Sequence, residues 1–349
     1  MSGAAPRFLF QAHSRRGLGH LARGLNLARE IRARAPAAEI VFHVSNPGAA
    51  SFCPPEYRCL VAGGAPRATP WPEALGLVRP DAAVFDTVLR PEDVSAATCR
   101  RVFVLRKTYG ERHGDLLSSG ALDEIDLVLV PHEEAEFENP LPPQVRRRTA
   151  FVGPIVRLPD PAAQAALRRK YGIAAGDFVL TSTAGGGGFE ETASRLFDTV
   201  WEAHGRLSAA LPRLRHVVVL GPQFTRRRAA LPGMTVVQSE PELVSLLALS
   251  SLVVAEGGYN TVNELRAVKT PAVFVPGART YDDQEDRVRA LEAVGVARVL
   301  TGSPSEMAHE LVAAAASRET LGAMRRSYAR DRLVPGNGAA AERILGLVQ

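Results

Sequence analysis

Short apolar runs alternate with longer amphipathic stretches along most of the chain. Runs of about four to eight apolar residues are typical of buried strands, and apolar residues three and four apart indicate one face of a helix. The clearest helix is expected at 21–35, where Leu21, Leu25, Ala28 and Ile31 share a face. Strands are expected at 7–12, 38–45, 81–87, 100–106, 125–131, 177–183, 214–221, 234–238, 251–256 and 271–277, and further helices at 189–207, 240–249, 261–268 and 283–295.

This alternation predicts an α/β fold with parallel sheets covered by helices on both faces. It breaks at 139–161, where six prolines and no helical period indicate an interdomain linker. The sequence therefore predicts two Rossmann-like doubly wound domains, 1–150 and 151–336, that face a central cleft. Three helical stretches close the chain, and the last, 337–349, is placed to cross back onto the first domain.

Composition narrows the class of protein. The chain of 349 residues is 46% hydrophobic and 23% charged, which is ordinary for a soluble protein long enough for two domains. No run approaches the roughly 20 apolar residues that span a bilayer, and the N-terminal apolar core is only Phe8 to Phe10. A cytoplasmic protein is therefore expected. Cys53, Cys59 and Cys99 lack CxxC spacing and are expected to be reduced thiols rather than disulfides or zinc ligands.

The net charge is +5, and almost all of the positive charges are arginines, because lysine occurs only at 107, 170 and 269. The basic clusters at 15–16, 146–148 and 226–228 are short, and no recognition helix or RNA-stacking signature accompanies them. This pattern favours a solvated basic surface and no nucleic-acid partner. Anionic ligands and a membrane surface stay open as partners.

Loops that follow strands are where open α/β sheets bind ligands. In the loop at 11–24, His13 follows a strand, and then Gly17, Leu18, Gly19 and His20 open a helix. The positive end of the helix dipole disfavours an imidazolium, which suits His20 as a general base. Alternatively, His20 caps the helix or packs in the wall of the cleft. His13 is a rival base or a substrate-binding residue, less favoured because it lacks the flanking glycine.

Glycine patterns distinguish several classes of nucleotide site. The first loop is not a dinucleotide fingerprint, because the third glycine is absent. Residues 185–188 are four consecutive glycines between a strand and a long helix; Gly185, Gly186 and Gly187 can wrap backbone N–H groups around a phosphate or allow domain movement. The Lys-Ser/Thr of a P-loop is missing, which argues against a kinase or an ATPase.

The stretch AEGGYNTVNEL, 255–265, leaves a buried strand and enters a helix. A glycine pair lets the backbone approach a ligand, and the first helical turn directs its N–H groups outward. Glu264 lies three residues after Thr261 on the same helical face, where a carboxylate can hold a vicinal diol such as a ribose, or can be a surface acid. The expected ligand-binding residues of this stretch are Gly257, Gly258, Tyr259, Asn260, Thr261 and Glu264.

A further polar group precedes the helix expected at 283–295. Asp282 or Asp283 can serve as the N-cap of that helix. Asp283 and Gln284 can also bind sugar hydroxyls, so both functions stay open.

Taken together and in order, four segments resemble the GT-B glycosyltransferases, and above all glycosyltransferase family 28. The best known member of that family adds N-acetylglucosamine to the peptidoglycan lipid precursor. The segments are GLGHLARGLNLA, GGGG, GGYNTVNELRAVKTPAVFVPG and YDDQEDRVRALEAVG. A related bacterial group of predicted glycosyltransferases also carries a GGYNT-type segment. The resemblance covers most of the chain, is strong at about 250–300, and in the N-terminal half is carried mainly by GLGH.

The resemblance implies a nucleotide-sugar donor on the second domain, with its diphosphate on the backbone of 257–261 and of the glycine loop. It matches Glu264 to the residue that holds the ribose, Gln284 with Asp283 to those that contact the donor sugar, and His20 to the histidine near the acceptor. It implies inversion at the anomeric carbon, no catalytic metal and no cofactor. Glu256 departs from the family, whose members often have His or Arg there, and must turn away, be protonated or be neutralised, for example by Arg279 or Arg287.

The expected mechanism is proton transfer from an acceptor hydroxyl to His20 during attack on the donor sugar. Asp86, at the end of an expected strand, is assigned to this site, either to orient His20 or to bind the acceptor, with a strand-end cap as the alternative. The acceptor, a natural product or an envelope precursor, and the base and sugar of the donor stay open, with UDP among the candidates. Two rival functions remain. One is a nucleotide-sugar hydrolase, since the hydrolase of the pseudaminic acid pathway resembles this chain at its G-x-G-H loop, and the other is a non-catalytic donor-binding partner, which Glu256 favours.

Overall fold

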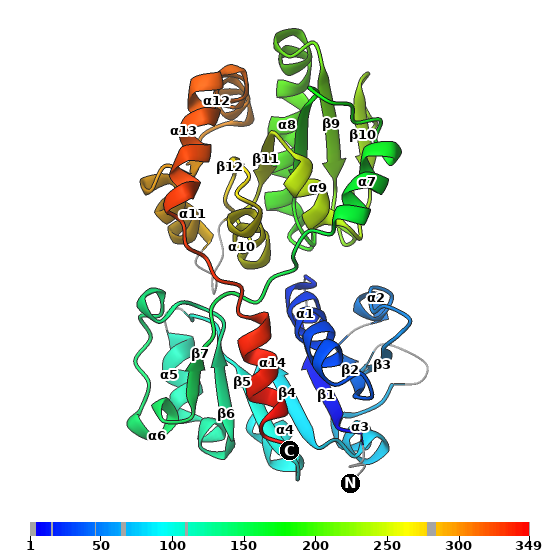
Figure 1. The fold of residues 1–349 in the computed structure, drawn as a ribbon, viewed down its shortest axis with the longest axis vertical. Helices are drawn as coiled ribbons and strands as arrows, with labels where there is room; N and C mark the ends of the chain where they lie inside the picture. Colours follow the sequence, from blue (N-terminus) through cyan, green and yellow to red (C-terminus); the bar gives the residue numbers. More distant parts are fainter. Residues whose placement is uncertain are drawn as a thin grey trace. The chain divides into compact units, whose positions relative to one another are not determined.

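The computed structural model describes residues 5–14, 17–45, 47–63, 68–108, 111–277 and 284–348. The chain divides into two compact units: Met1–Val156 together with Val334–Gln349, called unit 1, and Arg157–Leu333, called unit 2. Each unit is a parallel sheet with helices on both faces (Figure 1). Two Rossmann-like domains are therefore confirmed. The chain first leaves unit 1 after Val156, a few residues beyond the boundary at 150 that the sequence suggested.

The sheet of unit 1 has the strand order β3-β2-β1-β4-β5-β6-β7, and all its described pairs are parallel. Strand order reverses between the neighbours β1 and β4, and a doubly wound sheet binds ligands at the carboxyl ends of such a pair. The strands are β1 (Arg7–Ala12), β2 (Glu39–Val44), β3 (Arg58–Val61), β4 (Ala82–Asp86), β5 (Arg100–Val104), β6 (Leu127–Val130) and β7 (Thr149–Phe151).

Side chains of β1 alternate between the two cores of unit 1. Phe8 and Phe10 face a core that also contains the inner side of the first helix, whereas Leu9 packs with Trp71 and Phe85 on the other face. This alternation follows from the period of two of a strand. The helices are α1 (Gly19–Arg34), α2 (Pro47–Ala50), α3 (Trp71–Val78), α4 (Pro91–Ala96), α5 (Glu111–Ser118), α6 (Pro143–Arg146) and α14 (Asn337–Leu345), with 3-10 turns at Ala121–Glu124 and Glu134–Glu136.

The last helix, α14, belongs to unit 1. It packs beside α1, and Ala340, Ala341, Ile344 and Leu345 are buried in the same core as Phe8 and Phe10 (Figure 1). The N-terminal sheet is therefore covered on one face by a helix from the other end of the chain.

The prediction of an interdomain linker over the whole of 139–161 is wrong. It contains α6 and the edge strand β7, which pairs in parallel with β6. Pro142 and Pro143 stand at the start of α6, where a proline costs no helical hydrogen bond. The prolines therefore start a short helix here instead of marking a structureless segment.

Unit 2 repeats the topology of unit 1, with the strand order β10-β9-β8-β11-β12-β13. Its reversal point lies between β8 and β11, directly before the glycine loop at 185–188 and the glycine pair at 257–258. The elements are β8 (Phe178–Thr183), β9 (Leu214–Val219), β10 (Met234–Val237), β11 (Leu252–Ala255), β12 (Ala272–Phe274), β13 (Ala297–Val299), α7 (Pro161–Lys170), α8 (Glu190–Ala210), α9 (Leu243–Leu249), α10 (Tyr259–Val268), α11 (Gln284–Ala293), α12 (Pro304–Ala316), α13 (Arg318–Ser327) and the 3-10 turn η3 (Tyr328–Arg330).

The two segments of unit 1 that lead to and from unit 2 lie side by side. The Asn337 side chain accepts a hydrogen bond from the Val156 N–H at 3.0 Å and donates one to the Val156 carbonyl at 2.7 Å. The Gly336 N–H donates to the Pro154 carbonyl at 2.7 Å, and a Cβ at Gly336 would lie only 2.3 Å from the carbonyl oxygen of Gly153. Glycine is therefore required for this close backbone contact.

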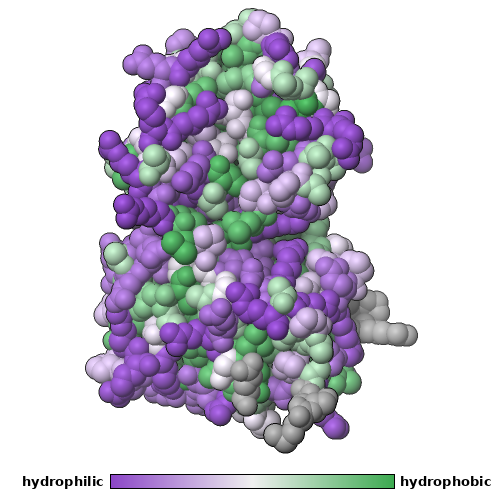
Figure 2. Space-filling model, viewed as in Figure 1, coloured by the Kyte–Doolittle hydropathy of each residue, from purple (hydrophilic) through white to green (hydrophobic). Residues whose placement is uncertain are grey.

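The surface carries no long apolar segment among the described residues. The exposed large hydrophobic residues include Leu77, Leu158, Val294 and Val334, which are far apart in sequence. Figure 2 shows hydrophilic residues interspersed with hydrophobic ones on the visible face. Of the helices in the described ranges, none has both the length and the hydropathy that crossing a membrane requires.

Candidate active site

His20 and Asp86 come together at the reversal point of the unit 1 sheet. His20 lies in the first turn of α1, which begins at Gly19, and Asp86 is the last residue of β4. The His20 Nδ1 atom lies 2.6 Å from Asp86 Oδ1. Because an ionised carboxylate only accepts hydrogen bonds, Nδ1 carries a proton, and in the neutral form of the ring the lone pair is on Nε2. The pair therefore presents an oriented base at a strand end.

Asp86 is almost completely buried and is held by two further side chains. Arg23 donates from Nε to Oδ2 at 2.8 Å and from Nη2 to Oδ1, and the Thr87 hydroxyl donates to Oδ1 at 2.9 Å. Burial by itself raises the pKa of the Asp86 carboxyl, but the charge of Arg23 and the hydrogen bond from His20 outweigh it and hold that pKa far below its usual range. Asp86 is therefore a carboxylate at all ordinary pH values.

His13 occupies the opposite face of the same strand ends and is paired with another histidine. His13 Nε2 lies 2.9 Å from His43 Nδ1, and His43 Nε2 lies 2.8 Å from the Thr69 carbonyl oxygen. A carbonyl can only accept, so His43 donates from Nε2, accepts at Nδ1, and receives the proton of His13 Nε2. Burial, followed by the nearby His43, Arg90 and His20, lowers the pKa of His13 to about 3. His13 is thus a neutral side chain, which disfavours it as the base.

The glycine loop of unit 2 is a tightly packed turn. The Gly185 N–H donates to Thr183 Oγ1 and the Gly187 N–H to the Ala184 carbonyl, both at 3.1 Å. The Gly186 carbonyl accepts from the Gln223 N–H at 3.1 Å. Gly187 has φ +68°, and a Cβ there would lie 2.8 Å from the Cβ of Phe224. Two of the amides are already engaged, so a phosphate at this loop would meet those of Gly186 or Gly188.

The glycine pair after β11 serves two different purposes. Gly257 has φ +94°, and a Cβ on it would lie 2.5 Å from Val288 Cγ1 of α11. Gly258 is the N-cap of α10, and a Cβ on it would meet nothing within 4 Å. Gly257 thus closes the turn, and Gly258 leaves open space in front of the helix. This arrangement leaves room for a ligand at the end of the helix that attracts anions.

The first turn of α10 supplies Tyr259, Asn260 and Thr261. The Val262 N–H bonds to the Gly258 carbonyl at 3.0 Å, and the amides before it are those that point outward from any helix start. Thr261 Oγ1 also lies 3.7 Å from the position of a Cβ on Gly185. The loop after β8 and the start of α10 are therefore neighbours, as expected for loops on either side of a reversal point.

Glu256 is buried, and its side chain contacts α8. The Thr192 hydroxyl lies 3.3 Å from Glu256 Oε1. Arg287 of α11 donates to the Gly257 carbonyl at 3.0 Å, and its guanidinium carbon lies 5.6 Å from the centre of the Tyr259 ring. A positive side chain therefore lies beside the glycine pair, while the carboxylate of Glu256 reaches Thr192.

Glu264 lies one turn further along α10 than Thr261. Burial of its carboxyl raises the pKa to about 7, and the charge of Arg157 opposes this rise. Gln284, the first residue of α11, is 5% exposed, and its buried Oε1 has no hydrogen-bond partner among the described residues. An unpartnered buried amide oxygen is costly unless a ligand meets it. Asp283, Asp282 and Arg279 lie outside the described residues.

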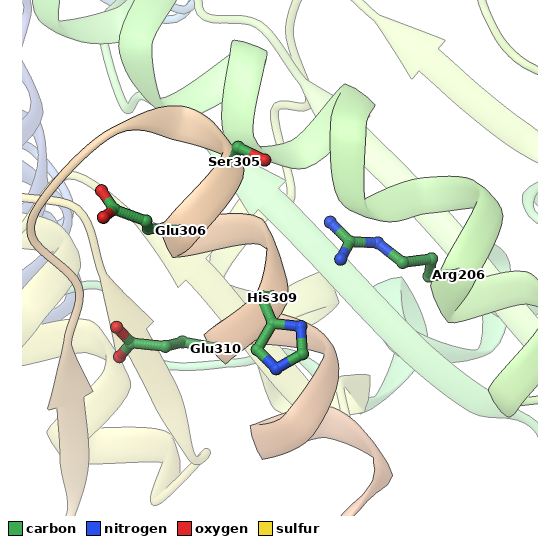
Figure 3. Close-up of a pocket in the computed structure, with 5 residues that line it drawn as sticks. All are labelled: Arg206, Ser305, Glu306, His309 and Glu310. Atoms are coloured by element: carbon green, nitrogen blue, oxygen red, sulfur yellow. The ribbon is translucent and has the colours of Figure 1, made fainter.

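A surface depression between α8 and α12 contains none of the predicted site residues. Figure 3 shows the Arg206 guanidinium directed toward α12, which supplies Ser305, Glu306, His309 and Glu310. Arg206 lies near the far end of α8, about 24 Å along the helix axis from its first residue, Glu190. The depression is therefore distinct from the glycine loop that precedes α8. Among the described residues, no group of three or more His, Cys, Asp or Glu side chains could hold a metal ion.

Comparison with known proteins shows that part of unit 2 is similar to a known domain family. Residues 221–329 match the glycosyltransferase family 28 C-terminal domain. Most of unit 2 therefore resembles that domain. The match contains 256–261, Glu264 and Gln284, whereas the glycine loop at 185–188 precedes it.

Proteins named as glycosyltransferases resemble the chain in sequence. It is 32% identical over 219 residues to the UDP-N-acetylglucosamine–N-acetylmuramyl-(pentapeptide) pyrophosphoryl-undecaprenol N-acetylglucosamine transferase of Methylobacterium sp. (strain 4-46). That alignment covers 60% of this chain and 56% of the relative. The chain thus spans about half the length of the curated relatives that it matches.

Solved structures share the fold of the whole chain, which is that of GT-B glycosyltransferases. The glycosyltransferase SnogD from Streptomyces nogalater aligns with a TM-score of 0.65 at 17% identity, covering 99% of this chain and 100% of that one. A Listeria monocytogenes protein proposed to be a UDP-N-acetylglucosamine 2-epimerase aligns with a TM-score of 0.62 at 12% identity, covering 99% and 96%. The fold alone therefore does not separate sugar transfer from epimerisation.

Sequence reasoning missed several residues of these clusters. From the sequence, Arg23 is expected to contact an anionic substrate or to be solvated, and its buried contact with Asp86 is not expected. It follows His20 by three residues and so shares its helical face, which was a readable signal. His43 interrupts an apolar strand, EIVFHV, and a polar residue there signals a buried partner. Thr87 and Thr192 carry no such signal, because threonine is common at strand ends and in first helical turns.

Proposed function

We propose that the chain transfers a sugar from a nucleoside diphosphate sugar to an acceptor hydroxyl, with inversion at the anomeric carbon and without a bound metal. The observation that carries this proposal is the family 28 match across the glycine pair and the start of α10. The named glycosyltransferase relatives favour transfer over the other reactions of this fold.

In this proposal, unit 2 binds the donor. Its diphosphate lies at the start of α10, where Gly258 leaves open space and the helix dipole favours negative charge. Arg287, beside the glycine pair, adds positive charge. Glu264 accepts hydrogen bonds from the ribose hydroxyls, and the Gln284 amide oxygen accepts one from the donor sugar. Asp283 remains a proposed partner of Gln284.

Unit 1 supplies the base. His20 takes the proton of the acceptor hydroxyl at Nε2 while the oxygen attacks the anomeric carbon, and Asp86 keeps the ring in the required tautomer. The bond from the anomeric carbon to the diphosphate oxygen breaks, and its electrons stay on the leaving group. The amides at the start of α10 stabilise that negative charge.

The donor can be identified by a thermal-shift screen with uridine, thymidine, guanosine and adenosine diphosphates and their sugars. A ligand present at about 100 times its Kd stabilises the native state by about 2.7 kcal/mol. We expect one nucleoside diphosphate to raise the melting temperature, and failure of every compound would favour a non-catalytic protein. Reactions with the stabilising sugar nucleotide, with and without natural-product and lipid-linked acceptors, then separate the functions. Full turnover without any acceptor would identify a hydrolase.

The role of His20 needs a matched pair of variants. His20→Ala is expected to lower turnover at least about a hundredfold with nearly unchanged donor affinity, because the loss affects proton transfer only. His309→Ala replaces an exposed histidine on α12 and should act like the wild type. Proton NMR of the product gives its anomeric configuration and so tests inversion. Activity that is retained in the presence of a chelator supports metal independence.

A further inference from the structure

Arg23 is among the largest fully buried side chains of the protein, with 1% exposure. Its guanidinium contacts both carboxylate oxygens of Asp86 and donates from Nη2 to Thr87 Oγ1 at 2.9 Å. A buried guanidinium on the inner face of a helix is unfavourable unless it is matched in charge and in hydrogen bonds. The Arg23 guanidinium is matched by Asp86, the residue that contacts His20.

Thr87 adds a second unusual feature at the same point. It has φ +60°, which is rare for a β-branched residue, and its N–H donates to the Val104 carbonyl at 3.0 Å. This conformation lets the hydroxyl donate to Asp86 and accept from Arg23. Local backbone strain of this kind persists where the surrounding structure fixes it, often at functional sites.

We propose that Arg23 is a positioning residue that holds the Asp86 carboxylate in place and cancels its charge, so that Asp86 orients His20 without drawing a proton onto it. This inference rests on the proposed function of His20 as the base. An isolated buried carboxylate beside a histidine favours the imidazolium, and a protonated His20 could not accept the acceptor proton. With Arg23 on the same oxygens, the pair is neutral as a whole.

The other groups near His20 do not replace this effect. Asp86 faces it from β4 and Arg23 from α1. His13, at the end of β1, interacts electrostatically with His20 but is neutral, and Arg90 interacts with His13. Among the described residues, Asp86 is thus the anion in direct contact with His20, and Arg23 is the cation in direct contact with Asp86.

The test is a double-mutant cycle in which the His20 ring is titrated by NMR in the protein without substrate. The His20 signal is assigned by its loss in His20→Ala. Arg23→Gln should raise the pH of half-protonation of His20 by about one unit, a tenfold change in proton affinity. Asp86→Asn should lower it by a similar amount. The double variant R23Q/D86N and the charge-conserving Arg23→Lys should stay within about 0.3 units of the wild type. Arg29→Gln removes a charge elsewhere on α1 and serves as the control.

The outcomes separate this inference from the proposed function. If Arg23→Gln fails to fold, comparison of Asp86→Asn with the double variant measures the effect of the Arg23 charge on His20. If Asp86→Asn fails to fold, comparison of Arg23→Gln with the double variant measures the effect of the Asp86 charge. A titration that is unchanged by removal of the Arg23 charge overturns the inference, whatever the protein catalyses. A titration that shifts as expected, combined with full activity of His20→Ala, supports the effect of Arg23 on His20 and removes His20 from the mechanism.

Discussion

Glu264 gives the protein a dependence on pH that can be measured before any substrate is known. Burial raises the pKa of its carboxyl to about 7 from an ordinary value of 4.5. Between pH 4.5 and about 7, the Glu264 carboxyl therefore keeps its proton in the folded state, whereas in the unfolded chain it has released it. The contribution of the protonated Glu264 side chain to stability is fully present below about pH 4.5 and is lost as the pH rises to about 7. Glu264→Gln cannot ionise and lacks this loss.

The size of the effect follows from the same two values. At about 1.4 kcal/mol per pH unit, the interval from 4.5 to about 7 corresponds to an upper limit of about 3.4 kcal/mol. The residue as a whole is only half-buried, so solvent screening should reduce this to about 1–2 kcal/mol. Relative to the wild type, Glu264→Gln should therefore gain that much in free energy of unfolding between about pH 5 and pH 8.

The two tryptophans make the assay specific for unit 2. Trp71 lies in unit 1 and Trp201 in unit 2, so urea unfolding of Trp71→Phe backgrounds, followed by fluorescence, reports on unit 2 alone. Glu202→Gln, on the exposed side of α8 beside Trp201, is the matched control and should follow the wild type. If the difference between Glu264→Gln and the wild type is the same at both pH values, Glu264 is ionised in the folded protein and the reasoning is refuted.

Three further variants test other parts of the structure. Gly257→Ala should lower the stability of unit 2 by about 1–3 kcal/mol, because φ is +94° and the new Cβ would lie 2.5 Å from Val288, whereas Gly258→Ala meets nothing within 4 Å and should have little effect in thermal unfolding. Gln284→Ala should weaken the donor sugar nucleotide more than the nucleoside diphosphate alone in calorimetry; equal losses would remove Gln284 from the sugar site. Ile344→Ala should destabilise unit 1 by about 2–5 kcal/mol when Trp71 fluorescence is followed, whereas the exposed Arg343→Ala should not; matching values would mean that α14 is not part of the core.

The central strands could be predicted from sequence because they are buried on both faces. Runs such as HVVV in β9 and LVVA in β11 have no other stable location in an α/β protein. Three of the four edge strands of the described sheets, β3, β7 and β13, were not expected; each has only three or four residues and contains a polar residue: Arg58, Thr149 or Arg298. The fourth, β10, was expected at 234–238. An edge strand faces solvent on one side, so its sequence carries a weaker apolar signal.

The approach of His20 to Asp86 was predictable for a different reason. His20 lies in the helix that follows β1, Asp86 ends β4, and carboxyl ends of parallel strands meet at one edge of the sheet. The pairing of His13 with His43 was not predictable, because it depends on which face of the sheet each side chain takes. The engagement of the Gly185 and Gly187 amides was also unpredictable, since it depends on how the turn folds back on Thr183 and Ala184.

The location of α14 in unit 1 has a consequence for biosynthesis. Unit 2 is a single continuous segment, whereas the core of unit 1 lacks Ile344 and Leu345 until α14 has left the ribosome. The domain that is synthesised first is therefore the last that can complete its fold. During translation, the apolar side of α1 that α14 later covers stays uncovered, and a nascent chain stalled before residue 337 would contain all of unit 2 but an incomplete core of unit 1.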